Sequence, residues 1–281
     1  MVEIIKNDKN TIIQINKKEQ RIAINVSINE FDTQHFGIIM ATLNWEQTEN
    51  INFFEINEIQ ELFDKCVKYC ILQNIKHAAF KANTKNYKII HIAESFGFNL
   101  VNVSVEYVFD YKKQAIKSLK NICRIRNANT NDLGTVLDIS KNIFKNFSRF
   151  HYDKFLDDEK ADEVYQEWVR KSFHGYADEI IISEYKNEIV GFCTIKNNFT
   201  TIKGENAAGV ILTGVSEKAR GLGIYTSMIN EAIMICNKLE NTRYIASSTQ
   251  AQNIFGQRAW SNLGFKIYNC VYIFHKIIGE V

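Results

Sequence analysis

The sequence VILTGVSEKARGLGIYTSMINEAIMIC, at residues 210–236, decides how the rest of the chain is interpreted. Its first six residues are a β-rich run, and a turn containing Gly221 and Gly223 follows. From Tyr225 to Leu239, apolar residues then recur at spacings of three and one, which is typical of one face of a helix. Glycines at a helix start let backbone N–H groups approach an anion closely, and those N–H groups lack internal partners. The stretch predicts a strand, a turn suited to a diphosphate and a helix from about 224 to 239; a plain tight connection is the competing interpretation.

Further elements are predicted on both sides of this stretch. A short strand is expected at 244–246, and a helix is expected to start at or just after Asn253. Gly264 stands where a helix C-cap glycine is expected. Upstream, the patterns predict a strand at 122–126, helices at 131–144 and from 157, and a hairpin formed by 179–184 and 189–196.

The N-terminal part of the chain has a similar pattern. β-rich runs precede elements expected as a helix at 55–72, a strand at 78–80, a helix at 84–96 and a strand at 100–109. The residues Phe-Gly-Phe at 96–98 parallel Leu-Gly-Phe at 263–265. We interpret this part as a partial, non-binding relative of the C-terminal part; a chance similarity is equally open. Residues 111–120 are basic and weakly patterned, so we predict two domains, at 1–115 and 120–281.

Composition narrows the classes of function. The 281 residues carry a net charge of +2, which gives no argument for nucleic acid or a membrane surface as partner. No apolar run reaches the length of a membrane span. The six cysteines are scattered and form no spacing typical of a metal site. We expect a cytoplasmic protein with reduced thiols and no metal.

Four landmarks resemble the acyl-CoA-binding core of the GNAT N-acyltransferase superfamily in order and spacing. They are Val215, Arg220-x-x-Gly223, Asn253 and the segment 263–265. The resemblance implies an α/β (α+β) fold with a mixed, mostly antiparallel sheet flanked by helices. It also implies a smaller, degenerate GNAT-like α/β domain at the N-terminus. The activity it implies is acyl-CoA-dependent N-acyl transfer, with acetyl-CoA as co-substrate.

The glycine-rich turn of that superfamily reads Arg/Gln-x-x-Gly-x-Gly/Ala. Arg220, Gly223 and Tyr225 occupy its three defined positions, although a small residue is usual where Tyr225 stands. The alternative register, Lys218-x-x-Gly221-x-Gly223, fits the glycines better. We prefer Arg220 because the step from the preceding strand and the onset of the helical period agree with it.

The resemblance implies how acetyl-CoA is bound. Backbone N–H groups at the end of the strand at 210–215 are expected to bind the pantetheine arm and polarise the thioester, while the glycine turn holds the diphosphate. Asn253 matches an asparagine that contacts the CoA arm, and it also suits a helix N-cap. The predicted contact residues are Leu212, Thr213, Val215, Arg220, Gly221, Leu222, Gly223, Ile224, Tyr225, Thr226, Asn253 and Trp260.

Trp260 occupies the position of the superfamily's usual general acid, a tyrosine seven residues after the asparagine. An indole N–H donates a hydrogen bond but delivers no proton at ordinary pH. Three interpretations stay open: water protonates the departing thiolate, the hydroxyl of Ser261 or Tyr225 substitutes, or the domain binds CoA without catalysis. We favour water because a thiolate is a tolerable leaving group, and we assign no catalytic acid.

Three further stretches are similar to the family of TDP-fucosamine acetyltransferases. They are FDTQHFG at 31–37, SRFH at 148–151 and YQEW at 165–168. The similarity implies that the acceptor is the amine of a TDP-linked amino sugar used in surface polysaccharide or glycan synthesis. Arg149 is expected to pair with an acceptor phosphate, and His151 to take the amine proton or line the wall. Anchoring of a buried loop is the competing interpretation for both residues.

Two other functions are compatible with the sequence. One is a GNAT enzyme that acylates another amine, such as an amino acid, a polyamine or a protein N-terminus. The other is a non-catalytic acyl-CoA sensor, which the tryptophan at the position of the acid suggests. A homodimer is a further expectation.

Overall fold

The helices and strands fall into two units, described here from a computed structural model that covers residues 2–7, 10–47, 51–120, 122–144 and 148–279. Unit 1 comprises Met1–Ser104, Tyr152–Asp157 and Cys270–Val281, and unit 2 comprises Val105–His151 and Asp158–Asn269. Neither unit is one continuous stretch of chain. The division into consecutive domains at 1–115 and 120–281 stays a prediction.

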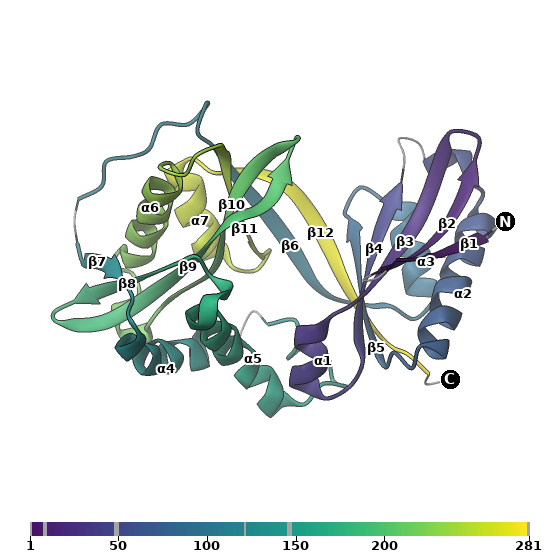
Figure 1. Cartoon of the computed structure of the whole chain (residues 1–281), viewed down its shortest axis with the longest axis horizontal. Helices are drawn as coiled ribbons and strands as arrows, with labels where there is room; N and C mark the ends of the chain where they lie inside the picture. Colours follow the sequence, from purple (N-terminus) through teal and green to yellow (C-terminus); the bar gives the residue numbers. More distant parts are fainter. Residues whose placement is uncertain (1, 8–9, 48–50, 121, 145–147, 280–281) are drawn as a thin grey trace. The chain divides into compact units, whose positions relative to one another are not determined.

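The sheet of unit 1 has the strand order β1-β2-β3-β4-β5-β12 (Figure 1). Neighbouring strands are antiparallel except β4 and β5, which are parallel. The strands are β1 (Val2–Lys6), β2 (Asn10–Lys17), β3 (Gln20–Ile28), β4 (Met40–Gln47), β5 (His77–Asn83) and β12 (Lys266–Ile277). The helical segments are α1 (Glu30–Phe36), η1 (Ile51–Phe53), α2 (Ile56–Leu72) and α3 (Tyr87–Ser95).

Helix α2 covers the core of unit 1 with the face that its sequence pattern predicts. Its buried residues are Ile59, Leu62, Phe63, Cys66 and Cys70, at spacings of three, one, three and four. Phe63 packs against several other aromatic rings of the unit, including Phe80 and Phe98. The amphipathic helix expected at 55–72 is therefore confirmed.

Residues 31–37 lie in α1, a short helix that the sequence patterns leave unassigned. The side chain of Asn29 caps its start by accepting from the N–H of Asp32, and Gly37 ends it in the left-handed region at φ 75°. A helix of seven residues is too short to show the apolar repeat on which the other predictions depend. Its caps carried the signal instead.

The sheet of unit 2 has the order β7-β8-β9-β10-β11-β6. The neighbours from β7 to β10 are antiparallel, and β10 and β11 are parallel. The strands are β6 (Asn99–Asp110), β7 (Arg124–Asn127), β8 (Glu179–Tyr185), β9 (Glu188–Ile202), β10 (Glu205–Val215) and β11 (Thr242–Gln250). The helical segments are η2 (Thr130–Asp132), α4 (Leu133–Ile143), α5 (Asp158–Lys171), η4 (Ser172–Tyr176), η5 (Glu217–Ala219), α6 (Ile224–Cys236) and α7 (Ile254–Leu263).

The two sheets share one strand order, and each draws its last strand partly from the other half of the chain. In both, four antiparallel strands are followed by a parallel fifth and then by a sixth. The sixth strand of unit 1 is β12, which follows α7, whereas that of unit 2 is β6, which follows α3. This exchange is one reason why neither unit is a continuous stretch of chain. The mixed, mostly antiparallel sheet flanked by helices is confirmed.

Several element ends differ from the sequence expectations by a few residues. Helix α6 ends at Cys236 rather than near 239 because the chain continues in turns, with the N–H of Leu239 donating to Cys236. Asn129 caps the helical segment η2, which precedes α4. Strand β11 runs from 242 to 250, well beyond the predicted 244–246. The prediction was too short because the polar residues at both ends of the strand have a lower β propensity than its centre.

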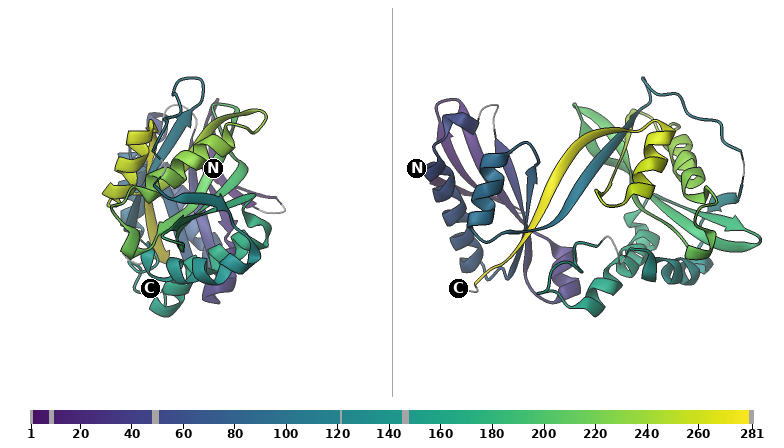
Figure 2. Two further views of the ribbon diagram at one scale, coloured as in Figure 1. Left: turned by 90° about the vertical axis from the view of Figure 1, so that its left-hand side faces the viewer. Right: turned by 180° about the vertical axis from the view of Figure 1, so that it is seen from behind.

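Helices α4 and α6 cover opposite faces of the unit 2 sheet (Figures 1 and 2). Residues 191 and 192 of β9 point to opposite faces because side chains alternate along a strand. A Cβ atom at Gly191 would meet Met228 of α6, whereas one at Gly214, the partner of residue 192, would collide with Ile143 of α4. Both helices therefore approach the sheet closely at Gly191 and Gly214, where the absence of a side chain leaves room for them.

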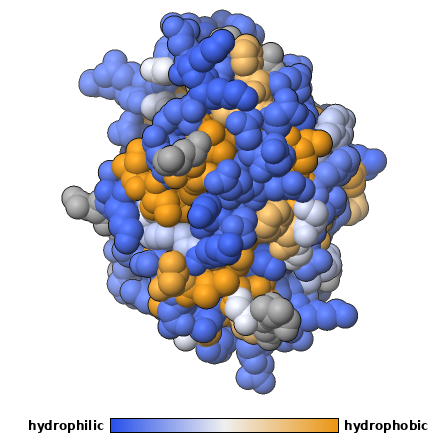
Figure 3. All heavy atoms as spheres, turned by 90° about the vertical axis from the view of Figure 1, so that its right-hand side faces the viewer, coloured by the Kyte–Doolittle hydropathy of each residue, from blue (hydrophilic) through white to orange (hydrophobic). Residues whose placement is uncertain are grey.

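Two surface features bear on partners of the chain. A space-filling view shows hydrophobic patches among polar side chains (Figure 3). Strand β1 ends the strand order of unit 1 and exposes Ile4 and Ile5, and α2 exposes Leu72. None of the described helices has the length and apolar character needed to cross a lipid bilayer.

The close packing at Gly191 yields the first prediction. A Cβ atom there would lie 2.9 Å from the carbonyl oxygen of Gly214 in β10 and 2.7 Å from Oγ of Ser183. The backbone of β10 cannot shift away from this methyl group without disturbing the sheet. Gly191→Ala is therefore expected to lower the free energy of unfolding by about 1–3 kcal/mol. Urea denaturation followed by circular dichroism measures the change.

Gly134→Ala in α4 is the matched control, since nothing lies within 4 Å of the added Cβ atom. Alanine is a better helix former than glycine, so this control should be neutral or slightly stabilising. Equal stability of the two variants would contradict the packing described for β9 and β10.

Candidate functional site

The parallel strands β10 and β11 separate partway along their length. Their ladder joins residues 206–209 of β10 to residues 242–246 of β11 and ends there, although both strands continue. On its other side, β10 stays paired with β9 as far as Val215. The β10 edge beyond Gly209, which we call the open edge, therefore presents backbone groups that β11 does not pair. An extended ligand can bind such an edge as an added strand.

A β-bulge lies at the start of the open edge. Val210 pairs with Ile195 of β9, but Leu212 pairs with the adjacent Thr194, so the register shifts between them. The N–H of Leu212 donates to Oγ1 of Thr194 at 3.0 Å, and Oγ of Ser247 donates to the carbonyl of Val210 at 2.8 Å. Bulges bend a strand and are frequent beside active sites.

The turn after β10 leads into a helix start that no side chain caps. Gly221 and Gly223 adopt positive φ angles of 79° and 82°, and α6 begins at Ile224. No side chain caps this end, and the first turn of α6 contains no acidic residue. The first N–H groups of α6 and the positive end of its dipole are thus available to an anion.

The other predicted residues of this turn differ in exposure. Arg220, Gly221, Leu222 and Gly223 are exposed, whereas Ile224 is buried and offers only its backbone N–H. The guanidinium of Arg220 pairs with Glu217 at 3.3 Å. Exposed ion pairs of this kind contribute little to stability, so the guanidinium can exchange Glu217 for a phosphate at small cost.

Asn253 is the N-cap of α7. Its Oδ1 accepts from the N–H of Gly256 at 3.2 Å, and its Nδ2 donates to Oγ1 of Thr249 at 2.9 Å. The capping role considered from the sequence is therefore present, and both polar side-chain atoms already have protein partners. Contact of Asn253 with the CoA arm stays a prediction.

Tyr225 and Trp260, the two residues that depart from the superfamily pattern, contact each other. Nε1 of Trp260 donates to the Tyr225 hydroxyl at 3.0 Å, and the indole is 3% exposed. The indole also packs edge-on against Tyr107 and lies tilted beside Phe265. Burial raises the pKa of the Tyr225 hydroxyl well above its ordinary value, and the hydrogen bond from Trp260 offsets part of that effect. Tyr225 is therefore protonated throughout the physiological range.

Arg149 and His151 follow α4 in a turn whose residues 145–147 lie outside the described part of the chain. The Arg149 guanidinium stacks 4.6 Å from the ring centre of Phe150, which is buried. Nε2 of His151 lies 2.9 Å from Oδ1 of Asp162 in α5. Within the described residues, the buried Nδ1 of His151 has no hydrogen-bond partner.

Sequence reasoning missed three residues that shape these sites. Thr194 and Ser247 hold the strands where β10 and β11 part, and Asp162 pairs with His151. Thr194 and Ser247 read as ordinary strand residues, and Asp162 reads as a solvent-facing residue of an amphipathic helix. The roles of Thr194 and Ser247 become visible only from the pairing register of the strands. The role of Asp162 becomes visible only because α5 brings it to His151.

The geometry agrees with comparisons to known proteins. Residues 141–265 match the sequence model of the Acetyltransferase (GNAT) family. The chain is 21% identical over 150 residues to the spore coat polysaccharide biosynthesis protein SpsD of Bacillus subtilis, a match that covers 53% of this chain and 49% of SpsD. The chain thus spans about half the length of that relative.

Two solved structures share the fold over nearly the whole chain. A GCN5-related N-acetyltransferase from Sphaerobacter thermophilus has a TM-score of 0.64 at 11% identity, covering 97% of this chain and 81% of its own. A tandem GNAT protein from the clavulanic acid biosynthesis pathway has a TM-score of 0.60 at 9% identity, covering 97% and 83%. The residues that match the Acetyltransferase (GNAT) family, 141–265, include the open edge of β10 and the uncapped start of α6.

Proposed function

We propose that this protein transfers the acetyl group of acetyl-CoA to the amine of a TDP-linked amino sugar used in surface polysaccharide or glycan synthesis. The observation that carries the acyl-CoA half is the open edge of β10, which runs through the glycine turn into the uncapped start of α6. The acceptor half is supported by the similarity to SpsD, whose name places it in polysaccharide synthesis. Another amine acceptor and a non-catalytic CoA sensor are the alternatives that the experiments below separate.

In the proposed reaction, the acceptor amine attacks the thioester carbonyl. A carbon–nitrogen bond forms, the carbon–sulfur bond breaks, and the electron pair leaves with the CoA thiolate. Backbone N–H groups near Thr213 and Val215 stabilise the oxyanion, because the open edge of β10 leaves donors that β11 does not pair, whereas the N–H of Leu212 already donates to Thr194 of β9. The amine must lose a proton, and the thiolate must be solvated or protonated.

His151 is the proposed acceptor of the amine proton. Asp162 accepts a hydrogen bond from Nε2, which leaves the lone pair on Nδ1 in the neutral ring. A carboxylate that fixes one ring nitrogen also stabilises the imidazolium that forms when the other nitrogen takes a proton.

The CoA thiolate is proposed to leave without a protein acid. A tyrosine whose pKa is raised by burial is a weaker acid than a thiol of pKa about 8.5, so full proton transfer from Tyr225 to the thiolate is uphill. Its hydroxyl accepts from Trp260 and can still donate one hydrogen bond. Tyr225 and Trp260 therefore shape the thioester pocket, and water protonates the thiolate.

The cellular location, the absence of a nucleic-acid or membrane partner and the oligomeric state remain predictions. We propose a cytoplasmic protein that requires no nucleic acid or membrane. A homodimer is supported by strand β1, which ends the strand order of unit 1 and exposes Ile4 and Ile5. Unpaired strand edges are common sites of association.

The second prediction concerns the glycine turn. Gly223→Ala is expected to weaken acetyl-CoA binding at least about tenfold, since the methyl group blocks close approach of backbone to the diphosphate. The added Cβ atom would also lie 3.1 Å from Ile122, and φ at residue 223 is positive, so some loss of stability accompanies the change. Isothermal titration calorimetry with acetyl-CoA measures the affinity.

Gly204→Ala controls for the backbone strain. Gly204 has φ +78° in the hairpin between β9 and β10, and nothing lies within 4 Å of its added Cβ atom. Both variants should lose similar stability, but only Gly223→Ala should lose CoA affinity. Unchanged affinity in a folded Gly223→Ala protein would remove the turn from the CoA site.

The third prediction concerns Tyr225. Because Tyr225 donates no proton in this account, Tyr225→Phe should keep kcat within about tenfold of the parent enzyme. General acid catalysis is typically worth about 10²–10⁴-fold, so a loss in that range would identify Tyr225 as the acid. Steady-state CoA release at saturating acetyl-CoA and acceptor measures kcat.

A second variant separates catalysis from packing. Tyr225→Phe leaves the buried Trp260 N–H unpaired, which costs about 1–3 kcal/mol of stability. Adding Trp260→Phe removes the donor as well, and the double variant should recover part of that loss. A kcat that follows stability through both variants points to packing alone.

The fourth prediction concerns the acceptor. In a panel of amines, CoA release should be fastest with a TDP-linked amino sugar, and Arg149→Ala should raise the KM for that acceptor at least about tenfold while leaving acetyl-CoA affinity unchanged. Arg149→Lys should recover only part of the loss, because an ammonium cannot bind phosphate with two parallel hydrogen bonds. Thermal-shift titration with TDP gives an independent readout.

Arg124→Ala is the control for loss of one positive charge, since the Arg124 side chain is exposed and pairs only loosely with Glu184 at 3.5 Å. Rapid turnover with a polyamine or a peptide would replace the sugar as acceptor. An absence of turnover with every amine, while acetyl-CoA still binds, would favour the sensor.

A further inference from the structure

Two histidines lie on one face of the unit 1 sheet because of strand register. In the antiparallel pairing of β5 with β12, His77 is opposite Ile277 and His275 is opposite Ala79. The two histidines are therefore diagonal neighbours, two positions apart, and their side chains point to the same face. The rings meet edge to face with centroids 4.5 Å apart. They are 1% and 3% exposed.

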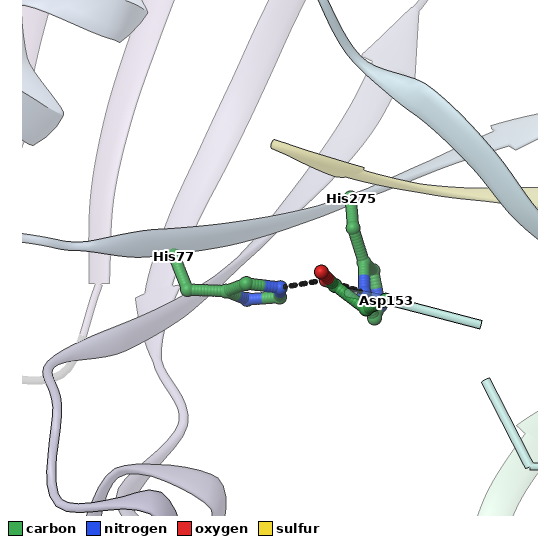
Figure 4. Close-up of side chains that lie close together, drawn as sticks. All are labelled: His77, Asp153 and His275. Carbon is green, nitrogen blue, oxygen red and sulfur yellow. Dashed lines mark hydrogen bonds and ion pairs between the residues drawn. The ribbon is translucent and has the colours of Figure 1, made fainter. Parts of the chain in front are cut away.

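A single aspartate oxygen lies between the two rings. Nε2 of His77 and Nδ1 of His275 are each 2.7 Å from Oδ2 of Asp153 (Figure 4). Asp153 belongs to Tyr152–Asp157, the segment of unit 1 that precedes α5 in the chain. The three ligand atoms all lie within 4.8 Å of one another.

The local backbone holds the carboxylate in this orientation. The N–H of Phe155 donates to Oδ1 of Asp153 at 3.1 Å, and the N–H of Leu156 donates to its carbonyl oxygen at 3.0 Å. One carboxylate oxygen is thus committed to the turn, and the other faces the rings. A carboxylate fixed by a further hydrogen bond is typical of metal ligands.

The charge of the cluster requires a positive partner. The Asp153 side chain is 10% exposed, and among the described residues the two histidines are its only ion-pair partners. Each neutral ring has one N–H, so both rings can donate to Oδ2, and one further proton would neutralise the carboxylate. The same two imidazole nitrogens and carboxylate oxygen, buried and within 4.8 Å of one another, match the ligand set of zinc and other first-row metals.

We propose that His77, Asp153 and His275 bind one divalent first-row transition-metal ion. Tetrahedral zinc keeps its ligand atoms about 3.3 Å apart, so Oδ2 of Asp153 must withdraw from the rings by roughly 0.6 Å to admit the ion. A water molecule completes the coordination. This proposal departs from the sequence-based expectation of no metal, which rested on local cysteine and histidine spacing.

The ion has a structural role in this account. It links β5, β12 and the segment 152–157. In sequence, Asp153 is 76 residues from His77 and 122 residues from His275. Metal binding to the folded state alone stabilises that state.

The test uses the full chain, stripped with a chelator and dialysed against Zn²⁺. Mass spectrometry of the metal content after gel filtration should give one zinc per chain, and the melting temperature should rise with Zn²⁺ and fall again with the chelator. Substitution with Co²⁺ should produce visible d–d absorption, which reports nitrogen and oxygen ligation without any variant. These readouts need no substrate, so they are independent of the proposed acetyl transfer.

Two variants and one control assign the ion to this cluster. Asp153→Asn keeps the shape of the ligand but removes its charge, and His275→Gln removes one ring; each should weaken Zn²⁺ binding by more than the roughly 10–100-fold typical of outer partners. His91→Gln removes an exposed histidine of α3 and should leave binding unchanged.

Less than one tenth of an ion per wild-type chain after Zn²⁺ dialysis, together with a melting temperature that Zn²⁺ does not change, would overturn the proposal. Zinc bound by Asp153→Asn and His275→Gln as tightly as by the parent protein would overturn it as well, whatever the His91→Gln control shows. The cluster would then be a hydrogen-bonded Asp–His pair that fastens residues 152–157 to the sheet.

Discussion

The separation of β10 from β11 is the constraint on which the function of unit 2 depends. Parallel strands gain stability from a full ladder of hydrogen bonds, yet this ladder stops at Gly209 and Ala246 while both strands continue. On the other side of β10, a bulge between Val210 and Leu212 shifts its register against β9, and the N–H of Leu212 donates to Oγ1 of Thr194. The cost of unpaired backbone is offset when an extended ligand occupies the edge, and acyl-CoA is the ligand that we propose for it.

The rest of unit 2 follows from keeping that edge open and in place. Glycines at 191 and 214 let α6 and α4 approach the sheet from opposite faces, so β9 and β10 are held between them. The strand then ends in a turn that delivers the start of α6 without a side-chain cap. Tyr225 and Trp260 stand where the GNAT pattern has a small residue and a tyrosine, and the indole N–H of Trp260 donates to the Tyr225 hydroxyl.

Sequence alone predicted the elements with strong periodicity or clear punctuation. The α2 face, the start of α6 after Gly223 and the end of α7 at Gly264 are all marked by local residues. The short helix α1 was missed although Asn29 and Gly37 mark its ends, because it is too short for an apolar repeat. The exchange of β6 and β12 and the bulge at 210–212 were not predictable, because they depend on strand pairing and register. The same holds for His77, Asp153 and His275, which no local spacing connects.

The central claim is that acetyl-CoA binds along the open edge of β10 and at the start of α6. Hydrogen–deuterium exchange followed by mass spectrometry tests it directly, because amides that donate to the ligand are protected from exchange. The account predicts that acetyl-CoA slows exchange in peptides covering residues 210–226 and leaves the β8–β9 hairpin at 183–190 unchanged. Exchange that stays the same at 210–226 while acetyl-CoA is bound would contradict it.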